Sequence, residues 1–280
     1  MEIELIIEKI VTSLKKVKGI DAIVLGGSRA RGNFIAESDI DIGIYYRDGS
    51  QLDLEELSRI ATYLDDTHRS NLITKIGEWG PWINGGGWLK TDGIATDFLF
   101  RDLNKVSTVI DDCLNKKIII DYQAGHPHGF INTIYLAETY YSKILWDNGN
   151  LITNLKYKII PYPLSIKTGI IDKFLWEAGF SNAIAYKGLL KDDIVYTTGC
   201  IYRVISCLTQ VLYALNETYL MNEKGALSAT DTFRFVPKDF KRRVENIVCS
   251  LTMESVTMNN LIEQLSGIII EVEELCKLHI

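Results

Sequence analysis

The hydrophobic and polar positions of the first hundred residues follow two different periods. Apolar residues at helical spacing predict an amphipathic helix over residues 2–18, which Gly19 would end. Short apolar runs over residues 21–25, 39–46 and 94–100 predict strands with at least one buried face. This region is therefore predicted to combine helices with a sheet.

Weaker signals lie between and after these elements. Asp53 and Glu56 resemble a capping box, and an apolar stripe behind them predicts another helix. Residues 106–114 are predicted to be helical and residues 117–122 to form a strand. Residues 77–88 are too rich in glycine and tryptophan for a regular element. They predict either a substrate-facing loop or a hairpin with an apolar cover.

Helical spacing dominates the second half of the chain. It begins near Ile131 and places Ile134, Ala137, Tyr141, Ile144 and Leu145 on one face. The sequence Pro161-Tyr162-Pro163 then breaks the chain. The long helices predicted beyond it, typical of an up-and-down bundle, cover residues 174–190, 194–215, 240–252 and 256–278.

Two carboxylates stand out in the strand predicted over residues 39–46. Strand alternation places Asp39 and Asp41 on one face and leaves isoleucines for the other. A divalent cation would relieve the repulsion between them, although such a pair can also lie on a solvated sheet edge. The glycine turn that precedes them, Gly26-Gly27-Ser28, has backbone N–H groups that could hold a phosphate. Together these features indicate phosphoryl or nucleotidyl transfer.

Known phosphate-binding fingerprints do not describe this turn. A Walker A loop ends in Gly-Lys-Ser/Thr, and the spacing of a dinucleotide-binding turn is also missing. Instead, Gly27-Ser28 followed by Asp39-x-Asp41 in an apolar strand resembles the signature of the DNA polymerase β-type nucleotidyltransferase superfamily. Members with a similar pattern include bacterial enzymes that modify aminoglycosides and lincosamides. That signature requires a third carboxylate on a later strand, where this chain has Asp97.

The resemblance implies an α+β fold, with a mixed sheet flanked by helices over residues 1–157 and a helical bundle over residues 158–280. It implies that two Mg²⁺ ions bind Asp39, Asp41 and Asp97, with Asp97 or Glu78 as general base. It also implies ATP or another nucleoside triphosphate as co-substrate. The residues assigned to that nucleotide are Gly27, Ser28, Arg31, Ser38 and, through similarity to spectinomycin/streptomycin adenylyltransferases, Lys224.

Several side chains near these motifs have two interpretations. Arg29 and Arg31 flank the glycine turn, where one could neutralise triphosphate charge or both could simply be solvated. His126 and His128 share a turn without further histidine or cysteine nearby. A hydrogen-bonded turn is therefore favoured over a zinc site, with a role near the substrate left open.

The composition limits the classes of molecule that the protein is expected to bind. The formal net charge is −6 and no basic face is visible, which argues against binding long nucleic acid and suits a polycationic small acceptor. The five cysteines are scattered without a Cys-x-x-Cys motif, as expected for reduced thiols in the cytoplasm. No uninterrupted apolar stretch is long enough to span a bilayer, and the acidic N-terminus does not resemble a signal peptide.

The leading hypothesis is a transferase that moves a nucleoside monophosphate, preferably AMP, onto a hydroxyl of a small molecule such as an antibiotic, releasing pyrophosphate. One alternative keeps this chemistry and changes the acceptor to a protein or a tRNA, as in toxins. Another is a non-catalytic nucleotide sensor, which the presence of all three carboxylates argues against. The oligomeric state stays open.

Overall fold

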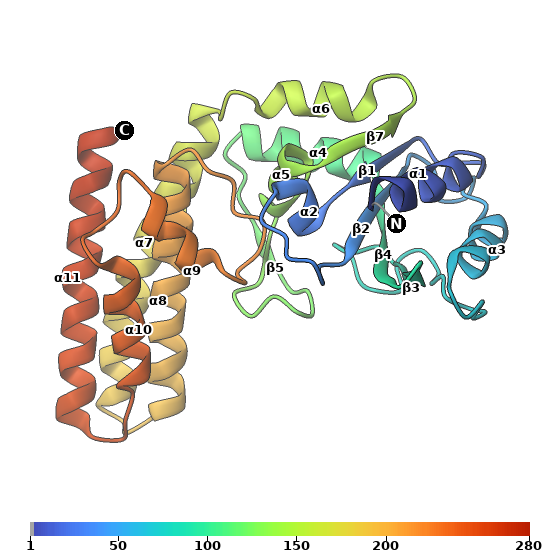
Figure 1. Cartoon of the computed structure of the whole chain (residues 1–280). Coiled ribbons are helices and arrows are strands. Elements are labelled where there is room, and N and C mark those ends of the chain that lie inside the picture. Colours follow the sequence, from blue (N-terminus) through green and yellow to red (C-terminus); the bar gives the residue numbers. More distant parts are fainter. Residues whose placement is uncertain (1–2) are drawn as a thin grey trace. The chain divides into compact units, whose positions relative to one another are not determined.

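A computed structural model describes residues 3–280 and divides into two compact units (Figure 1). Unit 1 comprises Met1–Asp111, Asp121–Gly125 and Tyr135–Pro161. Unit 2 comprises Asp112–Ile120, His126–Ile134 and Tyr162–Ile280. The chain therefore passes between the units several times, and the single boundary expected after residue 157 stays a prediction.

Unit 1 is built around a five-stranded mixed sheet with the order β3-β4-β2-β1-β7. Strands β2 and β4 are parallel, and the other neighbours are antiparallel. The bounds are β1 (Ala22–Leu25), β2 (Ile40–Tyr46), β3 (Gly86–Thr91), β4 (Ile94–Asp102) and β7 (Lys143–Asp147). The prediction of an α+β fold with a mixed sheet is confirmed.

The alternation in β2 has the predicted consequence. Ile40, Ile42 and Ile44 are completely buried, together with Phe98 and Phe100 of β4. Helices α1 (Ile3–Leu14) and α3 (Leu54–Leu64) add their apolar faces to this core. The side chain of Asp53 accepts a hydrogen bond from the backbone N–H of Glu56, which confirms the predicted cap of α3.

Other elements in the first 160 residues differ from the prediction. The first helix ends at Leu14, before Gly19, and Glu2 lies outside the described residues. The strand expected over residues 117–122 is only β5 (Ile120–Asp121), which pairs with β6 (Phe130–Ile131). The remaining helices are α2 (Gly27–Arg31), α4 (Leu103–Leu114), α5 (Ile134–Tyr141) and α6 (Leu151–Ile159).

The helix expected from Ile131 onward ends at Tyr141, so placing Ile144 and Leu145 on its face was wrong. Both residues belong to β7, which pairs with β1 and completes the sheet. Pairing with β1 satisfies backbone groups along this segment, and such tertiary context overrides local periodicity. The end of the glycine and tryptophan segment begins β3, which forms a hairpin with β4, one of the two alternatives that the sequence left open.

Unit 2 is mainly helical. Its long helices α7 (Leu164–Leu189), α8 (Ile194–Leu215) and α11 (Ser255–His279) pack against one another, and α10 (Phe240–Cys249) packs against α11. Short helices α9 (Ala226–Ala229) and η1 (Thr230–Thr232) lie between α8 and α10. Helix α7 begins at Leu164, earlier than expected. Helix α8 could cross a membrane by length and composition alone, but 67% of its most apolar window is buried, as in a core helix.

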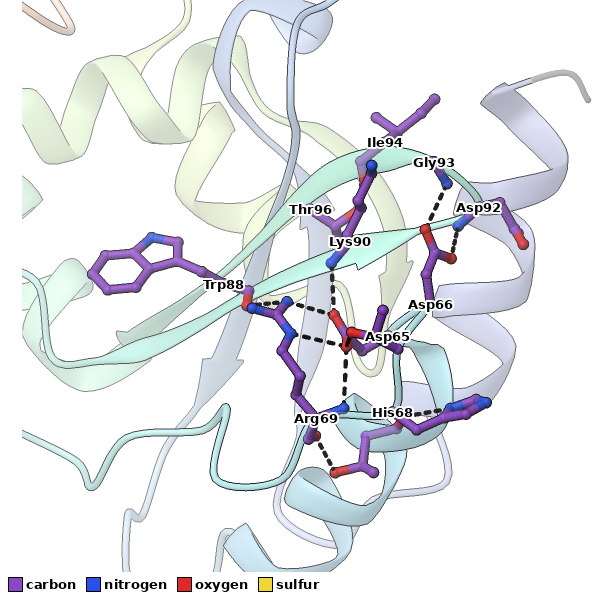
Figure 2. Close-up of polar contacts among 12 residues, drawn as sticks. Asp65, Asp66, His68, Arg69, Trp88, Lys90, Asp92, Gly93, Ile94 and Thr96 are labelled. Carbon is purple, nitrogen blue, oxygen red and sulfur yellow. Dashed lines mark hydrogen bonds and ion pairs between the residues drawn. The ribbon is translucent and has the colours of Figure 1, made fainter.

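A buried carboxylate at the end of α3 forms hydrogen bonds with the β3–β4 hairpin (Figure 2). The completely buried side chain of Asp65 accepts hydrogen bonds from Arg69 Nη2 at 2.6 Å and from the backbone N–H of Lys90 at 3.0 Å. The neighbouring Asp66 accepts from the backbone N–H groups of Asp92 and Gly93 in the hairpin turn. Because these hydrogen bonds favour the charged form, the pKa of Asp65 lies far below its usual range.

Replacing Asp65 with alanine is expected to lower the free energy of unfolding by about 2 kcal/mol, because the backbone N–H groups of Arg69 and Lys90 lose a buried, charged acceptor. Urea unfolding at neutral pH measures this. The control is Asp48→Ala in an exposed turn, which is expected to change stability by less than about 0.5 kcal/mol. Equal effects of the two substitutions would contradict the role assigned to Asp65.

Candidate functional site

Two of the predicted carboxylates lie side by side in the sheet. Asp41 of β2 is in direct register with Asp97 of the parallel strand β4. Paired residues of neighbouring strands present their side chains on the same face. Asp39 is exposed and immediately precedes β2, two positions before Asp41. The fold thus brings Asp97 to the two carboxylates that lie far before it in the sequence.

The electrostatics reflect this proximity. Burial, followed by the charges of Asp41 and Asp39, raises the pKa of Asp97 to about 6. Burial and the charge of Asp39 also raise the pKa of Asp41, while the nearby guanidinium of Arg29 acts in the opposite direction. The three aspartates therefore interact as charges, and full ionisation of the cluster is costly without a counter-charge.

The glycine turn lies directly against Asp41. The backbone N–H of Gly26 donates to the carbonyl oxygen of Asp41 at 2.8 Å. A Cβ atom on Gly27 would lie 1.7 Å from Asp41 Oδ2, and Gly27 has a φ of +60°. Both the space and the backbone conformation therefore favour glycine. Gly27 and Ser28 begin α2, so their N–H groups have no partner in a preceding helical turn.

Arg29 is buried, so it is not the solvated loop residue that the sequence allowed. Its Nε donates to the carbonyl oxygens of Ser38 and Asp39, each at 3.0 Å. Its Nη2 donates to the carbonyl of Ser38 as well. Arg29 thereby fixes the segment that leads into β2 and positions Asp39.

The other residues predicted to contact the nucleotide each have surroundings of their own. The guanidinium of Arg31 lies over the ring of Tyr141, 5.0 Å from its centroid. Ser38 uses its hydroxyl to accept from the backbone N–H of Ile35 at 3.0 Å. Lys224 is exposed in unit 2, just before α9. The roles of these residues in binding a nucleotide stay predictions.

Glu78 lies in the irregular segment that precedes β3. Its side chain is exposed, and Oε2 accepts from the backbone N–H of Lys75 at 3.0 Å. In the same segment Trp79 stacks on Trp88, and Trp82 is buried with its Nε1 donating to Asp121 Oδ2 at 3.0 Å. The segment is therefore held by ring stacking on β3 and by the contacts of Trp82, in keeping with the hairpin interpretation.

Sequence reasoning missed an ion pair close to the cluster. Buried Arg101, at the end of β4, binds Glu138 of α5, with Nη2 and Oε1 2.6 Å apart. The negative charge of Glu138 contributes to the raised pKa of Asp41. Because the partners lie on different elements, far apart in the chain, no local pattern indicates their contact.

The carboxylate groups of this site are suitable ligands for magnesium. Among residues 3–280, no three histidine, cysteine, aspartate or glutamate side chains are arranged to hold a metal ion. Mg²⁺ in phosphate-transferring sites, however, is commonly bound by one or two carboxylates together with substrate phosphates. Asp41 and Asp97 form such a pair, and their raised pKa values reflect negative charge that a cation would relieve.

Without divalent cations, Asp97→Asn is expected to raise the free energy of unfolding at pH 7.5 by about 1–2 kcal/mol. The folded-state pKa, about 6, lies above the ordinary value of 3.8, so folding favours the protonated carboxyl. The contribution of Asp97 to wild-type stability is therefore greatest at pH values below its unfolded-state pKa. This contribution falls as the pH rises through 6.

Urea unfolding in a chelating buffer at pH 7.5 and pH 4.5 measures this prediction. The advantage of Asp97→Asn is expected to shrink at the lower pH, where the wild-type carboxyl is largely protonated in the folded state. Added Mg²⁺ at pH 7.5 is expected to stabilise the wild type more than the variant. An advantage independent of both pH and Mg²⁺ would contradict the electrostatic account.

Comparisons with known proteins bear on this arrangement. Residues 8–76, which include Gly27, Ser28, Asp39 and Asp41, match the family model described as polymerase beta, nucleotidyltransferase. A nucleotidyltransferase-like protein from Exiguobacterium sibiricum 255-15 has a similar solved structure, with a TM-score of 0.49 and 9% identity. That similarity covers 96% of this chain and 74% of the other. No curated protein sequence matches this chain.

The family match covers the glycine turn and the first two carboxylates, and the fold supplies the third carboxylate in register with the second. The same combination of turn, strand pair and aspartates was expected from the sequence motif. Residues 8–76 of this chain therefore match a nucleotidyltransferase domain of the polymerase β type.

Proposed function

We propose that this protein transfers AMP from ATP, in a Mg²⁺-dependent reaction, to a hydroxyl group of a small molecule such as an antibiotic, with release of pyrophosphate. The observation that carries the proposal is the register of Asp41 with Asp97, next to Asp39 and against the glycine turn. A net charge of −6 supports a polycationic acceptor, which an acidic protein attracts.

Asp97 takes the proton of the acceptor hydroxyl in this proposal. A general base works best when its pKa lies near the operating pH, and the pKa of Asp97 is raised to about 6. The freed hydroxyl oxygen forms a bond to the α-phosphorus, and the bond between that phosphorus and the β-phosphate oxygen breaks. The electron pair of that bond leaves with pyrophosphate.

The remaining residues hold the reactants. Asp39, Asp41 and Asp97 would bind Mg²⁺, which when present neutralises phosphate charge and polarises the acceptor hydroxyl. The N–H groups of Gly27 and Ser28 provide donors for the phosphates beside Asp41. Arg29 keeps the segment carrying Asp39 in place through its bonds to the carbonyls of Ser38 and Asp39.

The test is pyrophosphate release with each of the four nucleoside triphosphates and Mg²⁺, in the presence of aminoglycosides, lincosamides or buffer alone. Release that depends on ATP and on one acceptor class, with AMP found on that acceptor by mass spectrometry, is the expected result. The double variant Asp39→Ala/Asp41→Ala is the control and is expected to show no release.

Two other outcomes would contradict part or all of this proposal. Nucleotide binding that needs Mg²⁺, without release for any small acceptor, would overturn the small-molecule proposal and leave a protein or tRNA acceptor, or a sensor. Absence of any nucleotide binding would overturn the assignment of the site itself.

A further inference from the structure

Unit 2 contains a cavity lined by its own residues alone. Its volume is about 350 Å³, within the range of small-molecule pockets. Helices α8 and α10 and the segment around α9 contribute most of the lining. The apolar part of the lining consists of Ile205, Leu220, Leu227, Val244 and Val248.

His128 is a lining residue with an unused hydrogen-bond donor. The side chain of His128 is nearly completely buried, and Arg203 Nη1 donates to its Nδ1 at 2.8 Å. Since Nδ1 accepts, the proton of the neutral ring is on Nε2. Burial and the charge of Arg203 lower the pKa of His128 to about 4, so the ring is neutral at pH 7. Within residues 3–280, Nε2 is buried without a hydrogen-bond partner.

Glu223 supplies an unused acceptor. Its Oε2 lies 3.1 Å from Nδ1 of His126, while Oε1 is buried and has no partner within the described chain. Burial raises the pKa of Glu223, but hydrogen bonds from His126 and from the backbone N–H groups of Glu223 and His128, with the charge of His126, together lower it below its usual value. The side chain is therefore a carboxylate at neutral pH, and its free oxygen accepts hydrogen bonds only.

We infer that this cavity binds an uncharged small molecule with an apolar body and one polar end that carries a hydroxyl or a primary amide. The polar end accepts from His128 Nε2 and donates to Glu223 Oε1, while the body packs on the aliphatic lining. A buried polar atom without a partner is energetically unfavourable, so a ligand that satisfies both atoms gains binding free energy. The inference does not depend on the transferase reaction.

The first test is calorimetric titration of the full chain with 2-naphthamide. Val248 is half exposed on α10 and lines the cavity, so Val248→Trp is expected to fill it without disturbing the core and to weaken binding at least about 10-fold. The matched control is Val195→Trp, an exposed position of α8 away from the cavity lining, which is expected to leave binding unchanged. Equal binding to wild type and to Val248→Trp would overturn the inference.

The second test concerns the polar end. Naphthalene-2-carboxylate is expected to bind the wild type at least about 10-fold more weakly than the amide, because its charge faces the carboxylate of Glu223. In Glu223→Gln this difference is expected to shrink, since the repelling charge is gone. Unchanged affinities for both probes would show that the polar end is not recognised, and failure of both 2-naphthamide and 2-naphthol to bind at their solubility limits would refute the proposal.

Cys249 allows the ligand to be located. Its thiol is exposed and lines the cavity, whereas Cys113, Cys207 and Cys276 are buried. Saturating 2-naphthamide is expected to slow modification of Cys249 by a thiol reagent, followed by peptide mass spectrometry. Partly buried Cys200, which lies outside the lining, serves as the internal control. Binding that leaves the Cys249 rate unaffected would place the ligand elsewhere and contradict the inference.

Discussion

Asp41→Asn is expected to lower nucleotidyl transfer by about 1,000-fold, the scale on which removing one preorganised charged group slows a reaction. Asp41 is flanked by Asp39 along the chain and by Asp97 across the sheet, so the substitution removes the central charge of the cluster. Asparagine keeps the size of the side chain, and the Gly26–Asp41 backbone hydrogen bond does not involve it. Steady-state pyrophosphate release with the best acceptor measures the effect.

The control for this substitution is Asp48→Asn, which removes a carboxylate from the exposed turn after β2. It is expected to leave activity within about twofold of the wild type. Thermal unfolding of both variants separates loss of catalysis from loss of structure. If Asp41→Asn kept more than about a tenth of the wild-type rate, Asp41 would not be part of the catalytic machinery.

Gly27→Ala is expected to reduce activity by about 100-fold, the cost of displacing a catalytic group by about 1 Å. The added methyl would lie 1.7 Å from Asp41 Oδ2, so the carboxylate or the turn must move. A positive φ of 60° adds a backbone cost of about 1 kcal/mol for any residue with a Cβ. Activity and urea unfolding measured on the same preparation distinguish these two contributions.

Gly32→Ala provides a matched comparison at the other end of α2. Gly32 has a φ of +81°, but its Cβ would meet no atom within 4 Å. This variant is therefore expected to lose about 1 kcal/mol of stability while keeping most of its activity. If both variants lost activity equally, backbone strain in α2 rather than contact with Asp41 would explain the effect.

The sequence predicted the parts of the site that local chemistry determines. The hydrophobic pattern of the first hundred residues identified β1, β2 and β4. The alternation along β2 correctly separated Asp41 from the buried isoleucines. Asp97 was expected from a family motif, and the sheet register then placed it opposite Asp41. These features depend on short segments whose hydrophobic pattern agrees with the final fold.

Contacts between distant segments could not be predicted in the same way. Ile144 and Leu145 fit a helical face, and only pairing with β1 makes their segment a strand. The partners of Arg29 are carbonyl groups of an irregular segment, which leave no signature in side-chain types. Likewise, His126 and His128 were correctly expected in a hydrogen-bonded turn, but Glu223 and Arg203 lie far along the chain.

The interleaving of the two units restricts how the protein can be divided. Strand β7 follows residues 126–134 of unit 2 in the chain, yet it pairs with β1 at the edge of the sheet. A fragment that stops before residue 143 would expose β1 as an unpaired edge, a common starting point for aggregation. During synthesis, the sheet of unit 1 can be completed only after part of unit 2 has already left the ribosome.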